Sequence, residues 1–216
     1  MSTPPRQRRK EARPAELLAA AFDLFVARGF AATRMEDIAQ RAGVSKGTVF
    51  LYFESKQALL RAVVEDAVLP HLAAGEAMVE AASGESPEVV LRQLLLCFAT
   101  ALADSRLAGL PKLISAEAGN FPELATYYHD NVVMRIRHLL VSVLERGIAV
   151  GVFRACDTTL VGRLAIAPIL FECMWQRLPD PCGQEPPLSP EAFIQTHLDL
   201  FIRGLLVNPH SPRKAE

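Results

Sequence analysis

The chain has 216 residues and a formal net charge of −1, half of its residues are hydrophobic, and 22% are charged. These proportions are typical of a folded globular protein and exclude a disordered or a fibrous one. A chain of this length can form one large domain, or a small domain joined to a larger one.

Charge is distributed unevenly along the chain. Residues 1–61 contain eleven Lys and Arg but six Asp and Glu, which gives this part a net charge of +5 and leaves −6 for the remainder. Binding to a polyanion depends on local rather than total charge, so the basic part is the one suited to a nucleic-acid partner. An excess of this size is common, and it is weak evidence by itself.

Cysteine and histidine spacings give no support to a metal site. The four cysteines form no CxxC pair, and the histidines show neither i, i+4 spacing nor a Glu-x-x-His motif. We therefore expect no metal and no other cofactor, and we expect reduced structural thiols at Cys97, Cys156, Cys173 and Cys182.

No segment is predicted to contact a membrane. The most apolar stretch runs from Leu164 to Phe171, which is far shorter than the roughly 20 residues of a spanning helix. No secretion signal is visible at the N-terminus. We expect a cytoplasmic protein.

The chain begins with a predicted basic arm and a first helix. Residues 1–13 have no apolar period and are expected to be flexible. A helix is predicted from Pro14, because apolar residues from Leu18 to Phe25 recur at helical spacing, and Gly29 ends it.

Two short helices separated by a turn are predicted between residues 33 and 53. Thr33 and Glu36 stand at capping-box spacing before the first helix, and Ser45 can cap the second. The turn between them has about the length that a helix-turn-helix requires.

Three residues make this motif specific. Ala39 is small where the two helices must approach each other, Gly43 allows the sharp turn, and Val49 fills the angle between the helices. Val44 and Phe53 would complete the small core. A three-helix unit that merely packs could carry the same residues, and this alternative stays open.

If Val49 faces inward, the start of the second short helix presents its other side to a DNA major groove. Lys46 can donate to guanine or to a phosphate, Thr48 can meet a base edge or a thymine methyl group, and Gly47 allows close approach. Phe50 faces outward with them, and the amides near Ser45 suit a phosphate.

Residues 33–60 resemble the DNA-binding signature of TetR-type regulators. The matching residues are Thr33, Ile38-Ala39, Ala42-Gly43-Val44, Lys46-Gly47, Phe50 to Phe53, Ser55-Lys56 and Leu59. The resemblance implies that Thr33, Tyr52 and Lys56 hold phosphates. The chain has Phe50-Leu51-Tyr52-Phe53 where the family often has Tyr-Tyr-His-Phe. The expected DNA-binding set is Thr33, Arg34, Ser45, Lys46, Gly47, Thr48, Phe50, Tyr52 and Lys56.

The expected fold is all-α, with a DNA-binding domain over residues 14–62 and a helical ligand-binding and dimerisation domain over 63–206. Ser55 can cap a fourth helix that Pro70 bends, and later helices are predicted to start near Ser86, Phe121, Asp157 and Ser189. Residues 178–190 are a predicted loop and 207–216 a tail.

A weaker resemblance, over residues 113–175, is to one subgroup of TetR-type ligand domains. The family resemblance implies that the last two helices pair with a second copy. The expected interface residues, which could equally form core, are Ile194, Leu198, Phe201, Ile202 and Leu205. The expected ligand residues, equally open to a core role, are Phe98, Met134, Phe171, Met174 and Trp175.

These features predict a homodimeric repressor that binds a near-palindromic operator in double-stranded DNA and is released by a small hydrophobic effector. An activator, or a repressor that needs its ligand, is the first alternative. A helical enzyme or carrier with a degenerate head is the second, although no catalytic residue set is visible.

Overall fold

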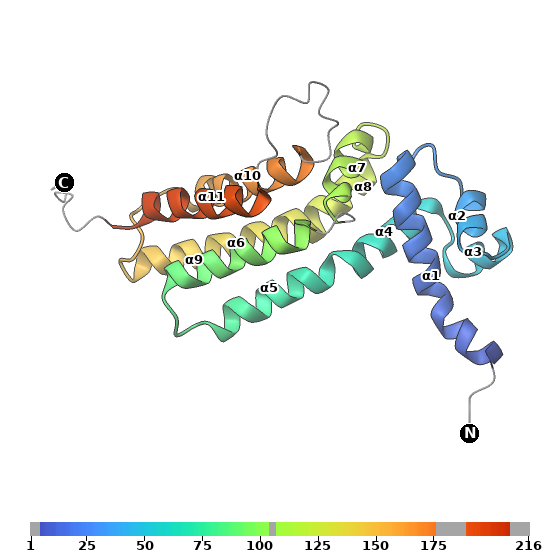
Figure 1. The fold of residues 1–216 in the computed structure, drawn as a ribbon, viewed down its shortest axis with the longest axis horizontal. Helices are drawn as coiled ribbons and strands as arrows, with labels where there is room; N and C mark the ends of the chain where they lie inside the picture. Colours follow the sequence, from blue (N-terminus) through green and yellow to red (C-terminus); the bar gives the residue numbers. More distant parts are fainter. Residues whose placement is uncertain (1–4, 104–106, 176–188, 208–216) are drawn as a thin grey trace. The chain divides into compact units, whose positions relative to one another are not determined.

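The computed structural model describes residues 5–103, 107–175 and 189–207, and the side chains among them except those of residues 5–13 and 175. These residues are almost entirely helical (Figure 1), which confirms the predicted all-α fold. An isolated antiparallel bridge joins Phe153 to Leu206. Most of the predicted loop 178–190 and tail 207–216, with Cys182, lies outside the described residues.

The chain divides into two compact units. One comprises Met1–Pro70 and Ser105–Val132, and the other comprises His71–Asp104 and Val133–Glu216. The predicted division after residue 62 therefore falls inside a helix, and the first unit also includes a segment from the middle of the chain. Helical periodicity reveals an apolar face but not the distant segment that covers it, so the sequence could not indicate this.

The first unit is built from six helices of its described residues. Helix α1 packs against α2, α4 and α7, while α2 packs on α3 and α8 packs on both α4 and α7. The bounds are α1 (Pro5–Arg28), α2 (Met35–Arg41), α3 (Lys46–Tyr52), α4 (Lys56–Ala67), α7 (Gly109–Glu117) and α8 (Pro122–Tyr128). Its core includes Leu17, Phe25, Phe30, Ile38, Val49 and Leu59, all of them fully buried.

Helix α1 begins earlier than the sequence predicted. It starts at Pro5 and continues through Pro14, so residues 5–13 belong to a helix. Most of them are Arg, Lys, Gln, Glu or Ala, which all favour helix, and this preference outweighs the backbone hydrogen bond that Pro14 removes.

The N-terminus of α2 is capped one residue later than predicted. The N-cap is Arg34, whose backbone N–H donates to Asp37 Oδ2 at 3.0 Å. The expected capping box of Thr33 and Glu36 is therefore wrong. Thr33 is fully buried, and its single hydroxyl proton is shared between the carbonyl oxygens of Leu24 and Gly29, which lie 3.3 and 2.8 Å from Oγ1.

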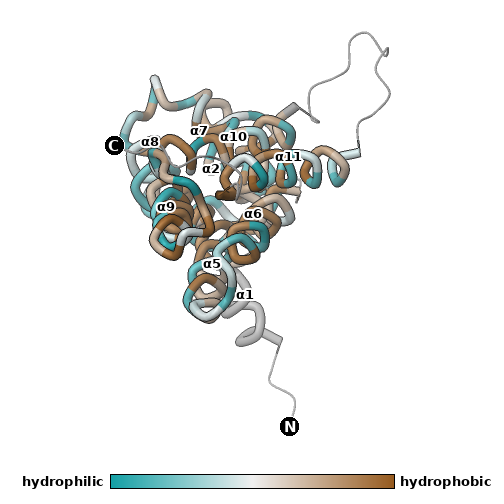
Figure 2. Tube along the Cα trace, turned by 90° about the vertical axis from the view of Figure 1, so that its left-hand side faces the viewer, coloured by the Kyte–Doolittle hydropathy of each residue, from teal (hydrophilic) through white to brown (hydrophobic). Residues whose placement is uncertain are grey.

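The second unit is a bundle in which α6 packs against α9, α10 and α11. Its helices alternate hydrophobic and polar residues, as Figure 2 shows. The bounds are α5 (Leu69–Ala81), α6 (Pro87–Ala103), α9 (Met134–Ala149), α10 (Thr158–Trp175) and α11 (Pro190–Leu205). A π-helical turn, His129–Val133, precedes α9. The bend predicted at Pro70 is a break between two helices, because α4 ends at Ala67 and α5 begins at Leu69.

Predicted caps account for several helix starts. Ser55 Oγ accepts from Ala58 N at 3.0 Å at the start of α4, and Ser189 Oγ accepts from Ala192 N at 3.3 Å at the start of α11. Asp157 plays the same part before α10. None of the helices in the described ranges combines the length and the hydrophobicity needed to cross a membrane.

Gly147 in α9 gives a first testable prediction. A Cβ at this position would overlap the ring of Phe153, which is buried. We expect Gly147→Ala to lower the free energy of unfolding by about 1–3 kcal/mol through overpacking, although alanine favours helix by about 1 kcal/mol relative to glycine. Chemical denaturation followed by circular dichroism measures the change.

Gly162 in α10 provides the matched control. Its Cβ would meet only Leu140 Cβ, at an ordinary 3.6 Å. Gly162→Ala should therefore leave stability unchanged or raise it. Equal effects of the two substitutions would contradict the overlap argument.

Candidate functional site

The turn between α2 and α3 has the geometry that the sequence predicts. Gly43 adopts φ +66°, in the left-handed region that favours glycine, and Val44 N donates to Ala39 O at 2.9 Å. Ala39 and Val49 are buried between the helices, while Val44 and Phe53 are half-buried. The first unit thus contains a helix-turn-helix.

Helix α3 turns a continuous exposed surface away from this core. Gly47 and Leu51 lie four residues apart, on the side opposite the buried Val49. Leu51 is 76% exposed and Phe50 is 43% exposed. A Cβ on Gly47 would meet only Ser45 Oγ, at 3.8 Å, so the surface there is open. We call Lys46, Gly47, Thr48, Phe50 and Leu51 the α3 surface.

Leu51 is the residue that the sequence analysis missed. Its position four residues after Gly47 could have indicated it, since residues at this spacing share a helix face. Together with the neighbouring Phe50, it forms exposed apolar surface of the kind that a partner covers.

Lys46 lies between a carboxylate and an aromatic ring. It forms an ion pair with Glu36 of α2 and lies 5.7 Å from the centroid of the Phe50 ring. The hydrogen bond from Lys46 is the main reason that the pKa of the Glu36 carboxyl is lowered. Both side chains are more than half exposed, so the pair is weak and easily exchanged for another partner.

The N-terminus of α3 is closed by its own side chains. Ser45 Oγ accepts from Thr48 N at 3.2 Å and lies 2.9 Å from Thr48 Oγ1. Both hydrogen bonds lie on an exposed edge. A hydroxyl oxygen there has a lone pair left to accept a further hydrogen bond. Arg34 is exposed at the start of α2, and Tyr52 is half-buried at the end of α3.

The family resemblance implies a phosphate contact for Lys56, but the structure shows its side chain bonded within the protein. Its ammonium group donates to three backbone carbonyls, of Phe30 at 2.6 Å, Ala31 at 3.2 Å and Thr33 at 2.8 Å. An ammonium group has three donors, so all of them are used within the protein. The same group lies 4.5 Å from the centroid of the Phe30 ring. Lys56 holds the loop between α1 and α2 and has no donor left for a phosphate.

Glu117 of α7 holds the same loop from another side. Its Oε1 accepts from Ala31 N at 2.9 Å, and Phe121 stacks edge-on against Phe30 with 4.8 Å between centroids. Burial lowers the pKa of Lys56, and the charge of Glu117 opposes this shift. Thr33 is buried beneath the loop and Lys56 is bonded to it, so neither side chain is part of the α3 surface.

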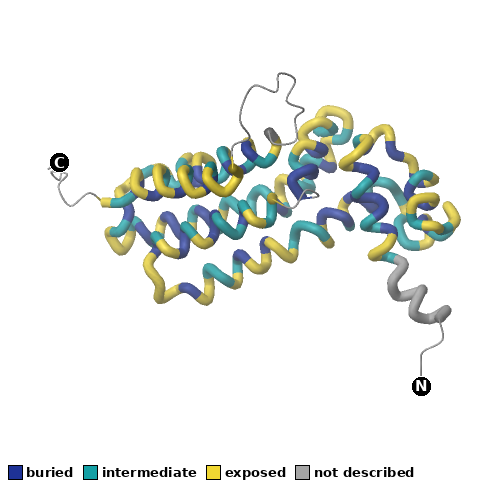
Figure 3. Tube along the Cα trace, in the orientation of Figure 1, coloured by how far each residue is buried: buried dark blue, intermediate teal, exposed yellow. Residues whose placement is uncertain are grey.

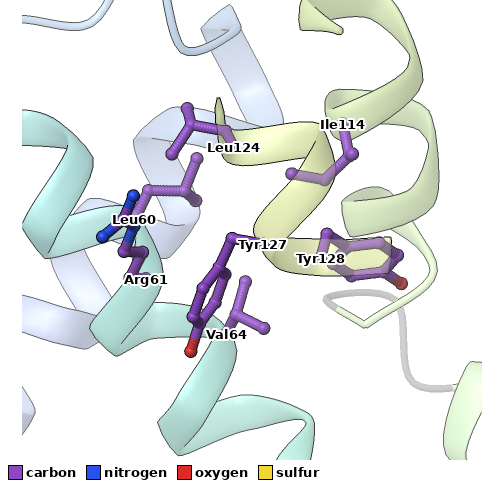
Figure 4. Close-up of a pocket in the computed structure, with 7 residues that line it drawn as sticks. All are labelled: Leu60, Arg61, Val64, Ile114, Leu124, Tyr127 and Tyr128. Atoms are coloured by element: carbon purple, nitrogen blue, oxygen red, sulfur yellow. The ribbon is translucent and has the colours of Figure 1, made fainter. Parts of the chain in front are cut away.

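A cleft between α4, α7 and α8 is filled by side chains. Figure 4 shows it, with Tyr127 and Tyr128 on one wall and Arg61 on the other. Tyr127 donates to Glu65 Oε1 at 2.7 Å, and the Arg61 guanidinium lies 5.3 Å from the Tyr127 ring centroid. Burial, helped by Glu65, raises the pKa of Tyr127 to about 12. The space that remains admits no ligand.

The second unit contains a pocket of about 370 Å³ between α6, α10 and α11. None of the expected ligand residues with described side chains lines it: Phe98 is buried, Met134 is half-buried, and Phe171 and Met174 are exposed. The side chain of Trp175 lies outside the described residues. The lining residues are Leu96, Ala99, Thr100, Leu102, Ala103, Glu172, Cys173, Pro190, Glu191, Ile194 and Gln195.

The expected interface residues on α11 are used within their own chain. Ile194, Leu198, Ile202 and Leu205 are buried, and Phe201 is half-buried against His197. Helix α10 instead carries exposed apolar residues at successive spacings of four, seven and three, and exposed residues recur along α11 as well (Figure 3). We call Leu160, Leu164, Phe171 and Met174 of α10, with Leu200 of α11, the exposed stripe.

Two family models match the chain. Residues 17–63 match the model described as bacterial regulatory proteins, tetR family, and residues 89–204 match the AefR-like transcriptional repressor C-terminal domain. The HTH-type transcriptional repressor Rv3405c of Mycobacterium tuberculosis is 36% identical over 111 residues, which are 51% of this chain and 54% of the relative. The chain spans between about a quarter and about half of the length of the curated relatives it matches.

Solved structures extend the similarity over most of the chain. The ketosteroid transcriptional regulator KstR2 of Mycobacterium tuberculosis has a TM-score of 0.70 and 26% identity, with 91% of this chain and 96% of that one covered. The regulator FadR of Bacillus subtilis, in complex with stearoyl-CoA, has a TM-score of 0.68 and 18% identity, with 88% and 98% covered. The second likeness concerns the fold alone.

The position of Lys56 gives the next prediction. Lys56→Met removes the donors of three carbonyls, so we expect a loss of about 1–3 kcal/mol in the free energy of unfolding. Faster amide hydrogen exchange should accompany it at Gly29 to Arg34. Hydrogen exchange read by mass spectrometry or NMR measures this.

Lys46→Met is the matched control in the same unit. Lys46 pairs only with exposed groups, so its loss should leave both stability and loop exchange unchanged. If the two lysine variants behave alike, Lys56 does not hold the loop.

Proposed function

Because the chain belongs to the TetR family of bacterial transcriptional regulators, we propose that it is a sequence-specific DNA-binding repressor of the cytoplasm that a small effector releases from its operator. The observation that carries the proposal is the α3 surface, which lies open beside a helix-turn-helix core. A helix presented in this way fits a DNA major groove. The relative Rv3405c, which is named a repressor, supports repression as the direction of control.

The residues of the α3 surface have the chemistry to read bases. Lys46 can exchange its exposed partner Glu36 for guanine acceptors or a phosphate. Gly47 allows the helix to approach closely, and Leu51 and Phe50 can contact thymine methyl groups. Arg34, Ser45, Thr48 and Tyr52 can position the helix through phosphates.

The exposed stripe is the surface that we propose for dimerisation. Its members on α10 recur at the spacing that pairs helices in coiled coils and bundles. A two-fold dimer would carry two α3 helices and would bind two half-sites about one helical turn, roughly 34 Å, apart. Two-fold protein symmetry then requires a near-palindromic operator.

Effector binding can weaken DNA binding only as far as it favours a state with poor operator affinity. The pocket in the second unit is a cavity with room for such a molecule. The name of KstR2, a ketosteroid regulator, favours a hydrophobic effector. Activation, or repression that needs the ligand, would use the same surfaces, and a reporter assay with and without the regulator distinguishes them.

Selection of bound duplexes from a random-sequence pool tests the proposed function. The purified full-length protein should enrich an inverted repeat, because two copies read the two halves. Absence of enrichment, with weak and salt-sensitive binding alone, would favour a helical enzyme or carrier with a degenerate head.

Two lysine variants separate base reading from loop support. Lys46→Ala should weaken binding to the selected operator by about 1–3 kcal/mol if Lys46 reads a base. If it contacts a phosphate instead, all sequences should weaken alike and the salt dependence should flatten by about 0.9 unit. Fluorescence anisotropy over a salt series measures both.

Lys56→Met should also weaken operator binding, but with an unchanged salt dependence, since its donors are used by carbonyls. A flattened salt dependence in this variant would mean that Lys56 contacts a phosphate after all.

Leu164→Glu tests the proposed dimer surface. Leu164 is 55% exposed within one chain, so the substitution should leave the fold intact, yet a charge in a paired apolar surface should dissociate the dimer. Analytical ultracentrifugation would then show a monomer. Val150→Glu, at a position 62% exposed outside the stripe, is the control and should remain dimeric.

A further inference from the structure

Leu51 is the most exposed large hydrophobic side chain in the described part of the chain, at 76%. It lies in the last turn of α3, two residues after the fully buried Val49. Two residues of separation place side chains about 200° apart around a helix, so Leu51 is directed away from the core. Phe50 beside it is 43% exposed. The last turn of the α3 surface is therefore apolar and uncovered.

The polar side chains of the α3 surface already have partners within the protein. Lys46 pairs with Glu36 and lies 5.7 Å from the Phe50 ring centroid. The Thr48 hydroxyl lies 2.9 Å from Ser45 Oγ. To read a base, these groups must exchange one polar contact for another, which yields a small net gain. An exposed apolar side chain makes no such exchange and gains from the water that contact releases.

The backbone beside Leu51 leaves room for a base edge to approach. Gly47 lies one turn before Leu51 on the same face, and a Cβ on it would meet only Ser45 Oγ, at 3.8 Å. No side chain at position 47 therefore holds DNA away from Leu51. Among the four bases, thymine alone presents a methyl group in the major groove. This methyl group is the base atom that suits an exposed leucine.

We propose that Leu51 determines specificity by packing against the C5 methyl group of one thymine in each operator half-site. The inference rests on the proposed function, because it requires α3 to lie in a major groove. It goes further by naming one residue as the reader and one base atom as its target. Burial of one methyl-sized group corresponds to about a fourfold gain in affinity.

Deoxyuridine substitution in the selected operator tests the proposal. Deoxyuridine lacks the methyl group of thymidine and pairs with adenine in the same way. Each thymine is replaced in turn, in both half-sites together, and fluorescence anisotropy measures the Kd of the full-length protein. At one or more positions we expect a loss of about fourfold for each half-site, hence about sixteenfold for the dimer. An operator that tolerates deoxyuridine at every thymine, or that contains no thymine, would overturn the proposal.

Leu51→Ala assigns the effect to its residue. Because Leu51 is exposed, the variant should fold normally, with an unchanged circular dichroism spectrum and melting temperature. It should bind the thymine operator as weakly as the unmodified protein binds the deoxyuridine operator. Combining the two changes should then cause no further loss, since each removes the same contact. If deoxyuridine still weakens binding by the full factor in Leu51→Ala, another residue reads the methyl group and the assignment is wrong.

Phe50→Ala is the matched control, since it removes the neighbouring exposed apolar side chain. Whatever its own affinity, this variant should remain sensitive to deoxyuridine at the position where Leu51→Ala is insensitive. Loss of that sensitivity in both variants would mean that the methyl group is read by the apolar patch as a whole, which contradicts the assignment to Leu51.

Repeating the duplex selection with Leu51→Ala gives a second readout. The preference for thymine should disappear at this one position of each half-site, while the rest of the inverted repeat remains. An unchanged repeat, or loss of the whole repeat in a folded variant, would mean that Leu51 does not choose the base. Absence of enrichment with the unmodified protein would remove the proposed function itself, so the two failures are distinguishable.

Discussion

The helix-turn-helix depends on the hydrogen bonds by which Lys56 holds the loop between α1 and α2. Three carbonyls of this loop, those of Phe30, Ala31 and Thr33, point at one ammonium group. Without that group they would need water or would remain unpaired, at a cost of about 1–3 kcal/mol for a buried acceptor. Glu117 and the Phe30 ring lie beside the half-buried charge and help to stabilise it.

This constraint matters because the two helices of the motif are too short to be stable alone. Helices α2 and α3 have seven residues each, well below the roughly 12–15 at which an isolated helix becomes even marginal in water. Their order must come from tertiary contacts. Val49 and Ile38 supply the apolar part, and the anchored loop fixes where α2 begins. The α3 surface is therefore positioned by residues that are not part of it.

The sequence predicted the elements better than their partners. Caps at Ser45, Ser55 and Ser189 and the turn at Gly43 could be read locally, because each needs contacts within a few residues. Contacts across the chain could not. Lys56 reaches back more than twenty residues to its carbonyls, and Glu117 meets Ala31 at a separation of 86 residues. The family resemblance implied a phosphate contact for Lys56, whereas the structure shows its ammonium group bonded to backbone carbonyls. Thr33 is a parallel case.

The apolar faces of the last two helices, α10 and α11, show why a sequence pattern alone does not distinguish a core from an interface. Apolar residues at helical spacing on α11 indicate a covered face, but the same pattern serves a core and an interface equally well. The structure uses that face of α11 internally, while α10 is apolar on more than one side and has its stripe exposed. A helix with two apolar sides can transmit a change from one to the other, because packed side chains respond to displacement as a unit. With Glu172 and Cys173 lining the pocket between the outward-facing Phe171 and Met174, α10 has the composition that such coupling requires.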